Sequence, residues 1–550
     1  MTVRTITLKA LVILHVIILL VLAGGYVAAT GENAGVSARY NMSYVYFGNP
    51  ASYTSLVDNT DGSLDEIAPN YFDLNEDGTL KLTPVVDRGF INGMHERGIK
   101  VVPFLSNHWD RQKGINALNN REVLASQVAE AISEYGLDGV NVDIENMTEN
   151  ERDIYTDFVR LLREKLPDGK TVSVAVVPNP YGLTQGWHAS YDYAGLARYC
   201  DYLLLMAYDE HYQGDVSKTG GAGPVAGYPF VEASIKAALR EVPAGKLLLG
   251  IPFYGRLWKR GAAYGGYGIS NNTVAELVME YNGKVIYDHV QKSPRAVVTI
   301  KASGKKPVVF GNTLEAGTYD IWFENEESIK RKLELVGKYG LKGAGSWSLG
   351  QEEKSTWDFY SLWLNGRYFG DIQKHWAKKA IVAAVDNGWM KGVSSARFLP
   401  DAPVTRAQAA AIIVRMLGID TAGFINSSPV FSDTAGHWAF AEIEAAAAYG
   451  LVKGTADGIF EPDEALTREQ MMVLLDRIID VGEPPGKIFF SDVTPETAQW
   501  AYESINRMAA AGLVSGFPDG LFHPKEIMNR GQIATLMVRI YPYIKAGADE

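Results

Sequence analysis

Three polar residues at alternate positions, Asn141, Asp143 and Glu145, stand in a segment that otherwise has the pattern of a buried strand. In a β-strand successive side chains point to opposite faces, so these three share one face and the intervening valines and isoleucine share the other. Two carboxyl groups on one face repel each other, which raises the pKa of the pair's second ionisation and keeps Glu145 protonated near neutrality. Such a group can give a proton to a leaving group and later take one from water.

The place of this row also favours catalysis. A (β/α)8 barrel carries its catalytic groups at the carboxyl-terminal ends of its strands. Three polar groups inside a barrel are costly unless they are hydrogen-bonded, so a structural purpose alone would be unusual. An edge strand with one solvated face is the alternative, but Leu137 and the apolar stripe indicate burial.

Further motifs follow at the ends of later strand-like runs. Residues 206–209 read MAYD, residues 250–256 read GIPFYGR, and Trp347 stands in the run GAGSWSL. With residues 138–145 (DGVNVDIE), they resemble the DGxDxDxE, MxYD, GxPxYGR and eighth-strand tryptophan signatures of glycoside hydrolase family 18. Asn141 stands where the family has its first inward aspartate.

This resemblance implies a retaining glycosidase that acts on N-acetylglucosamine-containing glycan, with the substrate's own 2-acetamido group as nucleophile. It implies that Glu145 is the acid and base, that Asp143 orients the acetamide N–H, and that Tyr208 hydrogen-bonds the acetamide oxygen. The residues that it implies for substrate binding are Asn141, Met206, Asp209, Tyr254, Arg256 and Trp347. A glycan-binding, lectin-like protein without turnover is the alternative, although such relatives usually lack the acid.

The sequence also departs from the family pattern. The third-strand SxGG motif is absent, and residues 104–108 read FLSNH instead. The sixth and eighth motifs continue as DEHY (209–212) and LGQE (349–352), which is similar to the branch of spore-cortex and cell-wall N-acetylglucosaminidases. We therefore expect peptidoglycan to be favoured as substrate, with chitin as the alternative, and leave endo or exo action open.

The elements that would position these groups alternate strand-like and helix-like runs, which predicts an α/β fold with a parallel sheet. Eight strands with the acid on the fourth predict a TIM barrel at residues 37–363, with a small α+β insertion at about 259–319. The expected strands are 41–48, 67–74, 100–106, 138–145, 172–178, 202–209, 247–255 and 343–349.

From residue 368 onward the sequence repeats itself about every sixty residues. Copies are expected at 367–424, 428–483 and 487–550, each with a Phe-x-Asp opening and a later helix start at TRAQ (405–408), TREQ (467–470) or NRGQ (529–532). The first two tetrads are capping boxes and the third is a close variant. Each copy is too small to bury a helical face alone, so we expect the three to pack into one all-α unit.

These copies resemble S-layer homology repeats, which implies attachment to a secondary cell-wall polysaccharide, often through acidic sugars. The arginine at each helix start would offer a bidentate fork to a carboxylate. The residues expected to bind the wall polymer are Arg406, Arg468, Arg530, Trp376, Trp438 and Trp500. A purely structural helical tail is the alternative, but it would not explain an arginine at the same capped position in every copy.

Composition narrows the setting. A chain of 550 residues is too long for one core, and a net charge of −12 argues against nucleic acid and against a polybasic membrane surface. The single cysteine, Cys200, allows no internal disulfide, and the nine histidines show no metal spacing, so we expect no cofactor and no metal. Residues 1–29 read as a signal peptide, with an uncleaved anchor as the alternative. We therefore expect a protein secreted to the bacterial cell surface, with the membrane involved only through that segment.

Overall fold

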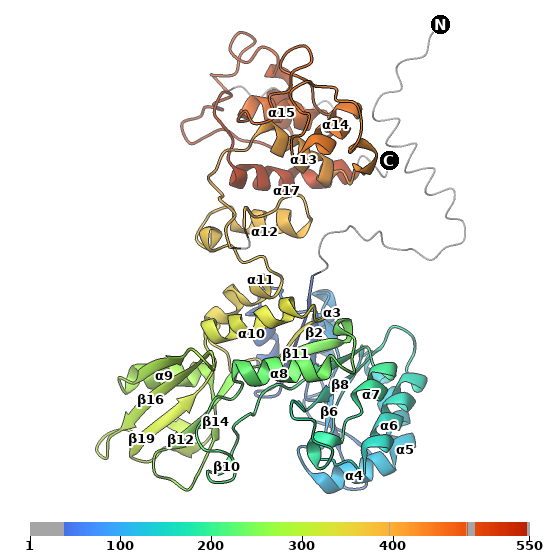
Figure 1. The fold of residues 1–550 in the computed structure, drawn as a ribbon, viewed down its shortest axis with the longest axis vertical. Coiled ribbons are helices and arrows are strands. Elements are labelled where there is room, and N and C mark those ends of the chain that lie inside the picture. Colours follow the sequence, from blue (N-terminus) through green and yellow to red (C-terminus); the bar gives the residue numbers. More distant parts are fainter. Residues whose placement is uncertain (1–37, 395, 480, 482–489, 547–550) are drawn as a thin grey trace. The chain divides into compact units, whose positions relative to one another are not determined.

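The computed structural model describes residues 38–394, 396–479, 481 and 490–546. The chain forms two compact units in it, one at Arg39–Gly366 and one that begins at Arg367 (Figure 1). The signal peptide predicted at residues 1–29 lies outside the described residues. None of the helices in the described part of the chain has the length and apolar character that a membrane crossing requires.

The first unit is built on a closed parallel barrel. Pairing runs from β3 through β6, β7, β8, β9, β11, β20 and β1 to β2, and β2 pairs with β5. Because β2 and β3 are halves of one strand, as are β5 and β6, the ring closes with eight strands, and the predicted TIM barrel is confirmed. Its strands are β1 (Tyr40–Val45), β2 (Glu66–Pro69), β3 (Phe72–Leu74), β5 (Lys100–Val101), β6 (Phe104–Ser106), β7 (Gly139–Asp143), β8 (Thr171–Val176), β9 (Tyr202–Leu205), β11 (Leu247–Pro252) and β20 (Gly343–Trp347).

The second and third strands are interrupted, which the sequence reading did not foresee. Pro69 and Pro103 have no N–H, so neither can donate to a ladder. The chain bends at Asn70, whose N–H donates to the Val45 carbonyl, and continues as β3, against which β4 (Leu80–Leu82) pairs antiparallel. The other predicted strands begin within two residues of their expected starts but end earlier. Glu145 therefore stands just beyond the end of β7, and Met206, Tyr208 and Asp209 stand beyond the end of β9.

Helices cover the outside of the barrel (Figure 1). Asp87 and Asp110 cap the helices that follow them, and Asn325 with Ser328 forms a capping box at α10. The helices are α2 (Pro50–Asp58), α3 (Arg88–Glu96), α4 (Arg111–Asn119), α5 (Arg121–Tyr135), α6 (Arg152–Lys165), α7 (Tyr193–Tyr199), α8 (Tyr228–Ala238), α10 (Glu326–Lys338) and α11 (Tyr360–Leu364).

A carboxyl group is buried inside the barrel at the amino-terminal ends of its strands. Glu66, the first residue of β2, is fully buried and accepts hydrogen bonds from the hydroxyls of Tyr40 (2.7 Å) and Tyr202. Burial raises the pKa of Glu66 to about 7, although both tyrosine hydrogen bonds lower it. A carboxyl bound by two tyrosine hydroxyls therefore fills this end of the barrel, at the opposite end of the strands from Glu145.

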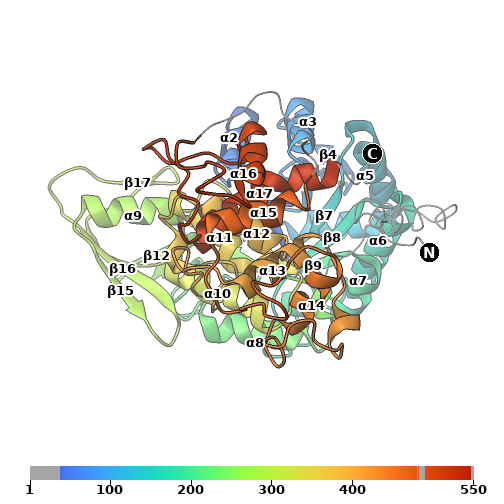
Figure 2. The ribbon, with the colours of Figure 1, turned by 90° about the horizontal axis from the view of Figure 1, so that it is seen from above.

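The predicted α+β insertion is an antiparallel sheet with one helix, and it has its own apolar core. It extends from Tyr254 to Trp322, somewhat beyond the expected 259–319. It separates from the barrel helices α5–α7 in both views of the unit (Figures 1 and 2). The main sheet has the order β14-β12-β19-β16-β15. Its elements are β12 (Tyr254–Lys259), β13 (Tyr264–Gly265), β14 (Tyr267–Ser270), α9 (Asn271–Glu280), β15 (Lys284–Asp288), β16 (Ser293–Ile300), β17 (Val308–Val309), β18 (Asn312–Thr313) and β19 (Gly317–Trp322). β10 (Gly214–Asp215) pairs with β13 and ties the loop after β9 to the insertion.

The second unit contains the three predicted copies packed around one core. Its helices are α12 (Lys378–Asp386), α13 (Arg406–Met416), α14 (Phe440–Ala448), α15 (Arg468–Asp476), α16 (Tyr502–Ala510) and α17 (Arg530–Ala546). The second helix of each copy packs on the first helix of the next: α13 on α14, α15 on α16, and α17 back on α12. Backbone bridges at 405–465, 467–527 and 403–529 follow the same order, so the copies form a closed ring.

Candidate active site

The polar row at the end of β7 is held from within the barrel. Asn141 is fully buried; its amide oxygen accepts from the Tyr44 hydroxyl (2.8 Å) and its amide nitrogen donates to Ser173 (2.8 Å). These bonds satisfy the polar group that would otherwise make an inward asparagine costly. Asn141 thus lies beneath the site rather than at its surface, and it has no exposed atoms with which to touch a sugar.

Asp143 and Glu145 form the centre of the site. Asp143 is 5% exposed, and its Oδ1 has no hydrogen-bond partner among the described residues, whereas Glu145 is partly exposed two residues beyond the end of β7. Burial raises the pKa of Asp143. Burial, and then the negative charges of Asp143 and Asp209, raise the pKa of Glu145 well above its usual value. The pair can therefore hold a proton near neutrality on the more accessible carboxyl.

The backbone of Glu145 is clamped by Asn107, a residue that the sequence reading did not select. The Glu145 N–H donates to Asn107 Oδ1 and the Asn107 amide nitrogen donates to the Glu145 carbonyl, both at 2.9 Å. Asn107 is fully buried. The only signal in the sequence was the departure from SxGG, since Asn107 belongs to the FLSNH run that replaces it.

The neighbouring backbone is held in the same manner. The Tyr191 hydroxyl donates to the Ile144 carbonyl (3.1 Å), and the Ile144 N–H donates to the Tyr155 hydroxyl (3.3 Å). One residue further, the Asn146 carbonyl accepts from Arg111 (2.9 Å). Three successive residues at the strand tip are thus fixed by side chains from other elements, which preorganises the position of the Glu145 carboxyl.

The residues after β9 and β11 meet on one side of this centre. Asp209 accepts hydrogen bonds from Tyr254 and Arg256, both at 2.8 Å. Tyr208 lies close enough that Asp143 and Glu145 act on it; burial and then those charges raise the pKa of its phenol, which stays a hydrogen-bond donor. Gly250 leaves room for it, because a Cβ there would lie 2.8 Å from the Tyr208 ring. Met206 is buried and contributes little exposed surface.

Aromatic rings lie near the ends of β20 and β7. The Trp347 ring packs near Tyr44 and Phe104, with centroids 5.1 and 5.9 Å apart, and the peptide bond after Trp347 is cis. Trp109, which is 49% exposed, stands edge-on to Trp187 at 5.8 Å. The Trp109 carbonyl accepts from Asn146, the residue after Glu145, so this pair adjoins the acid. Sequence reasoning missed both tryptophans because neither belongs to a motif.

In the second unit the capping boxes are confirmed at Thr405, Thr467 and the variant Asn529. The arginine after each box, however, forms its hydrogen bonds with the next copy in the ring. Nε of Arg406 donates to the Phe460 carbonyl (2.7 Å), Nε of Arg468 to that of Phe522 (2.9 Å), and Nε of Arg530 to that of Phe398 (2.9 Å).

One terminal nitrogen of each arginine also donates to a carbonyl, and each guanidinium stacks on the phenylalanine ring. The side-on fork that was expected to meet a sugar carboxylate is therefore occupied by backbone. These arginines join adjacent copies, and a role in wall binding remains a prediction for their other nitrogens.

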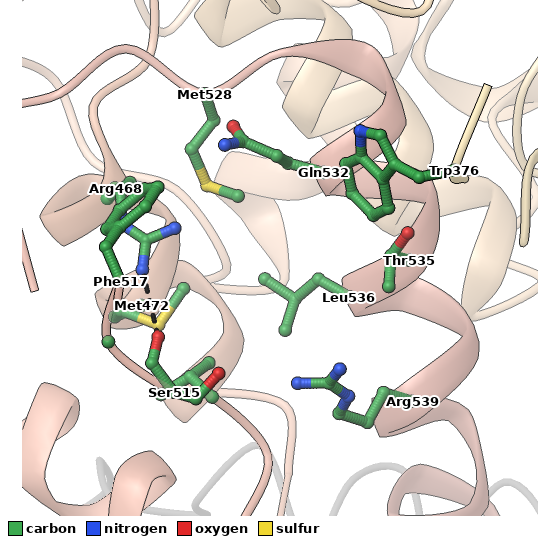
Figure 3. Close-up of a pocket in the computed structure, with 12 residues that line it drawn as sticks. Trp376, Arg468, Met472, Ser515, Phe517, Met528, Gln532, Thr535, Leu536 and Arg539 are labelled. Carbon is green, nitrogen blue, oxygen red and sulfur yellow. Dashed lines mark hydrogen bonds between the residues drawn. The ribbon is translucent and has the colours of Figure 1, made fainter. Parts of the chain in front are cut away.

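The tryptophans of the copies are on the surface. Trp376, Trp438 and Trp500 are 65%, 58% and 54% exposed. Figure 3 shows a pocket of about 200 Å³ that brings Trp376 of the first copy and Arg468 of the second together with Gln532, Leu536 and Arg539 of the third. Two of the residues predicted to bind the wall polymer thus share one pocket where the copies meet.

Comparison with known proteins agrees with this geometry. Residues 368–410, 430–472 and 489–534 each match the S-layer homology domain. The chain is 27% identical over 293 residues to the cortical fragment-lytic enzyme of Bacillus subtilis (strain 168), which covers 52% of this chain and 64% of that protein. It is 34% identical over 160 residues to cell surface glycoprotein 1 of Acetivibrio thermocellus, which covers 28% of this chain and 7% of that one.

Among solved structures, the fold is similar to that of the Bacillus cereus spore cortex-lytic enzyme SleL, with a TM-score of 0.51 and 21% identity over 59% of this chain and 74% of that one. This likeness concerns the fold alone. The chain spans less than two thirds of the length of the curated relatives named above. Residues 43–352 match glycosyl hydrolases family 18, and because this match spans more than half of the sequence, the chain belongs to that family.

Proposed function

We propose that this chain is a glycoside hydrolase, exported and held at the cell wall, that cleaves β-1,4 linkages of N-acetylglucosamine-containing glycan with retention of configuration. The observation that carries the proposal is the pair of carboxyls at the end of β7. One is buried with an oxygen that has no partner in the described part of the chain, and the other is partly exposed. No second protein carboxylate is needed as nucleophile if the acetamido oxygen of the substrate attacks the anomeric carbon.

In the first step the protonated Glu145 carboxyl gives its proton to the glycosidic oxygen. The bond from that oxygen to the anomeric carbon breaks as the acetamido oxygen bonds to the carbon, which gives an oxazolinium ring and a free alcohol. The unpartnered Oδ1 of Asp143 is suited to accept the acetamide N–H and to offset the positive charge of the ring. Tyr208 is suited to donate to the acetamide oxygen.

In the second step the Glu145 carboxylate takes a proton from water, and the resulting hydroxide oxygen bonds to the anomeric carbon as the ring opens. Glu145 ends protonated and the acetamide is restored. The raised pKa of Glu145 supports this double role, because an acid must be protonated at the start and basic enough to activate water later. The residues present need no cofactor for either step.

The test of the chemistry is Glu145→Gln in the full chain. We expect its turnover of peptidoglycan and of N-acetylglucosamine oligomers to fall by orders of magnitude while its thermal unfolding stays near that of the parent, because the two side chains have the same shape. A thiazoline that mimics the oxazolinium should inhibit the parent. Near-normal turnover of the variant, or indifference to the thiazoline, would overturn the mechanism.

The site also supports a substrate preference. We infer that wall glycan is favoured over chitin, because the loops after strands three, six and eight depart from the chitinase pattern at residues 106–108, 210–212 and 349–352. Digestion of peptidoglycan should then leave N-acetylglucosamine at the reducing ends, and fragments ending in N-acetylmuramic acid would contradict the proposal. The ring of S-layer homology repeats, with its exposed tryptophans, would hold the enzyme on wall polysaccharide.

A further inference from the structure

The insertion contains a groove to which the chemistry above assigns no task. Residues of β12, β14, β19 and the β17–β18 hairpin enclose about 690 Å³, a volume in the range of ligand sites. We call it the insertion groove. Leu257 and Tyr319, which belong to the apolar core of the insertion, line it together with Tyr264, Tyr267 and Phe310.

The insertion groove lies on the opposite face of the sheet from the candidate active site. Side chains alternate along β12, and Arg256 points to Asp209 at the active site. Leu257 therefore points the other way, and Tyr267, which is paired directly with Leu257 across β12 and β14, shares its face. The groove residues and the arginine that contacts the active site are therefore on opposite faces of this sheet.

The lining of the insertion groove suits a sugar chain. Tyr264, Tyr267 and Phe310 are 49%, 44% and 53% exposed, although each carries a ring that solvent disfavours. Asn312 and Thr313, both exposed, add amide and hydroxyl groups beside these rings. Aromatic faces next to uncharged hydrogen-bonding groups match a pyranose, which has an apolar C–H face and hydroxyls at its edge.

The surroundings favour glycan over other polymers. The charged groups of the lining are Lys259 and Glu315, which balance each other, and this argues against nucleic acid. The groove also adjoins the barrel mouth, because the Phe310 ring stacks on Phe47, the second residue after β1, at 5.5 Å and 17°. Ring contacts of Phe47 with Tyr46 (5.0 Å) and of Tyr46 with Trp347 (5.8 Å) continue this line to the active site, so a chain leaving it has an aromatic path toward the groove.

We propose that the insertion groove is a second glycan-binding site, which holds a distant part of the same polysaccharide whose cleavage is proposed above. The inference rests on that proposed function for the class of ligand. It makes the enzyme selective for long chains, since only a chain that spans both faces of the insertion gains the extra contacts.

The experiment compares Tyr267→Ala/Phe310→Ala with Met279→Ala, a matched change on α9 of the same insertion at a side chain 81% exposed and outside the groove. Turnover of an aryl glycoside of N,N′-diacetylchitobiose reports the active site alone. Binding of hexameric N-acetylglucosamine and of purified peptidoglycan glycan strands is measured by calorimetry with each change placed in the Glu145→Gln chain. Thermal unfolding checks the fold, and Tyr264→Ala replaces the double variant if that one unfolds.

We expect the groove variant to bind the long chain at least about tenfold more weakly, with aryl-glycoside turnover equal to that of Met279→Ala. Equal binding of the long chain by the two variants would overturn the proposal that the groove binds glycan. Loss of aryl-glycoside turnover in the groove variant would also overturn it, because the rings would then serve the active site itself. If the parent chain turned over neither the aryl glycoside nor peptidoglycan, the proposed function would be refuted. The binding comparison would still decide whether the groove binds glycan.

Discussion

The proposed catalytic carboxyl, Glu145, stands two residues beyond the end of its strand, and the backbone of Glu145 itself is held by one asparagine. Asn107 forms two hydrogen bonds with the Glu145 backbone and is itself fully buried. Gly114 leaves space for it, since a Cβ at Gly114 would lie 2.9 Å from the Asn107 amide nitrogen. We therefore regard Asn107 as a positioning residue for Glu145.

Asn107→Ala should lower kcat about 10- to 100-fold with little change in KM, because a displaced acid costs more in the transition state than in substrate binding. A better-solvated Glu145 would have a lower pKa, so the basic limb of the kcat/KM profile should move to lower pH. The control is Asn116→Ala on α4, which removes an exposed hydrogen bond from the side-chain amide to the Glu76 carbonyl. A variant that loses stability but keeps kcat and its pH profile would assign Asn107 a purely structural part.

Glu66 predicts a pH dependence of stability. Its pKa is about 7 in the fold against 4.5 for a free glutamate, so the folded chain binds more protons between these values. The free energy of unfolding should therefore decrease as pH rises from about 4.5 to 7, by up to about 3 kcal/mol. Glu66→Gln should remove this slope. In calorimetric scans of the barrel transition, the variant should therefore unfold at a higher temperature than the parent at pH 8 but not at pH 5. Parallel slopes for parent and variant would exclude Glu66 as the cause.

At the scale of elements, the repeat copies depend on arginines that cross from each to the next. Arg530→Ala removes two hydrogen bonds to the carbonyls of Phe398 and Lys391 and a stacked cation. We expect it to destabilise the ring by about 2 kcal/mol, whereas Arg397→Ala at an exposed position should change little. Calorimetry of the full chain measures both, and an unchanged transition in Arg530→Ala would contradict the joining role.

The elements of the fold also differ in how well the sequence predicts them. Alternation within residues 138–145 predicted the inward polar row, the alternation of strand-like and helix-like runs predicted a barrel of eight strands, and the repeat of about sixty residues predicted the three copies. The Asn107 clamp could not be predicted, because it joins residues 38 positions apart through a contact that only the closed barrel creates. For the same reason the arginines were expected to face a ligand, since the carbonyl acceptors of their Nε atoms lie 54 positions away for Arg406 and Arg468 and 132 positions away for Arg530. The split of strands two and three depended on local bends that hydropathy does not record.

At the scale of the whole molecule, the residues that match glycosyl hydrolases family 18 and those that match the S-layer homology domain belong to different compact units. A chain that ends at Gly366 keeps Asn365 and Leu364, whose oxygens accept from Arg39 at the start of the barrel. We expect it to cleave soluble glycan like the parent and to fail to sediment with purified walls. Trp376→Ala in the full chain should weaken sedimentation without affecting cleavage, because that ring is exposed in the pocket of Figure 3. Sedimentation of the shortened chain would place wall binding in the barrel unit.

The closed order of the repeat copies has a consequence for how such a tail could arise and be altered. Because α17 packs on α12, the packing of the ring does not depend on which copy comes first in the chain. A circular permutant that opens between the second and third copies should therefore assemble the same core. A chain with two copies would leave two helices without their partners, and one with four would have a copy that cannot enter a ring of three. Duplications of this tail should therefore be retained only in multiples of three, or by pairing between neighbouring molecules.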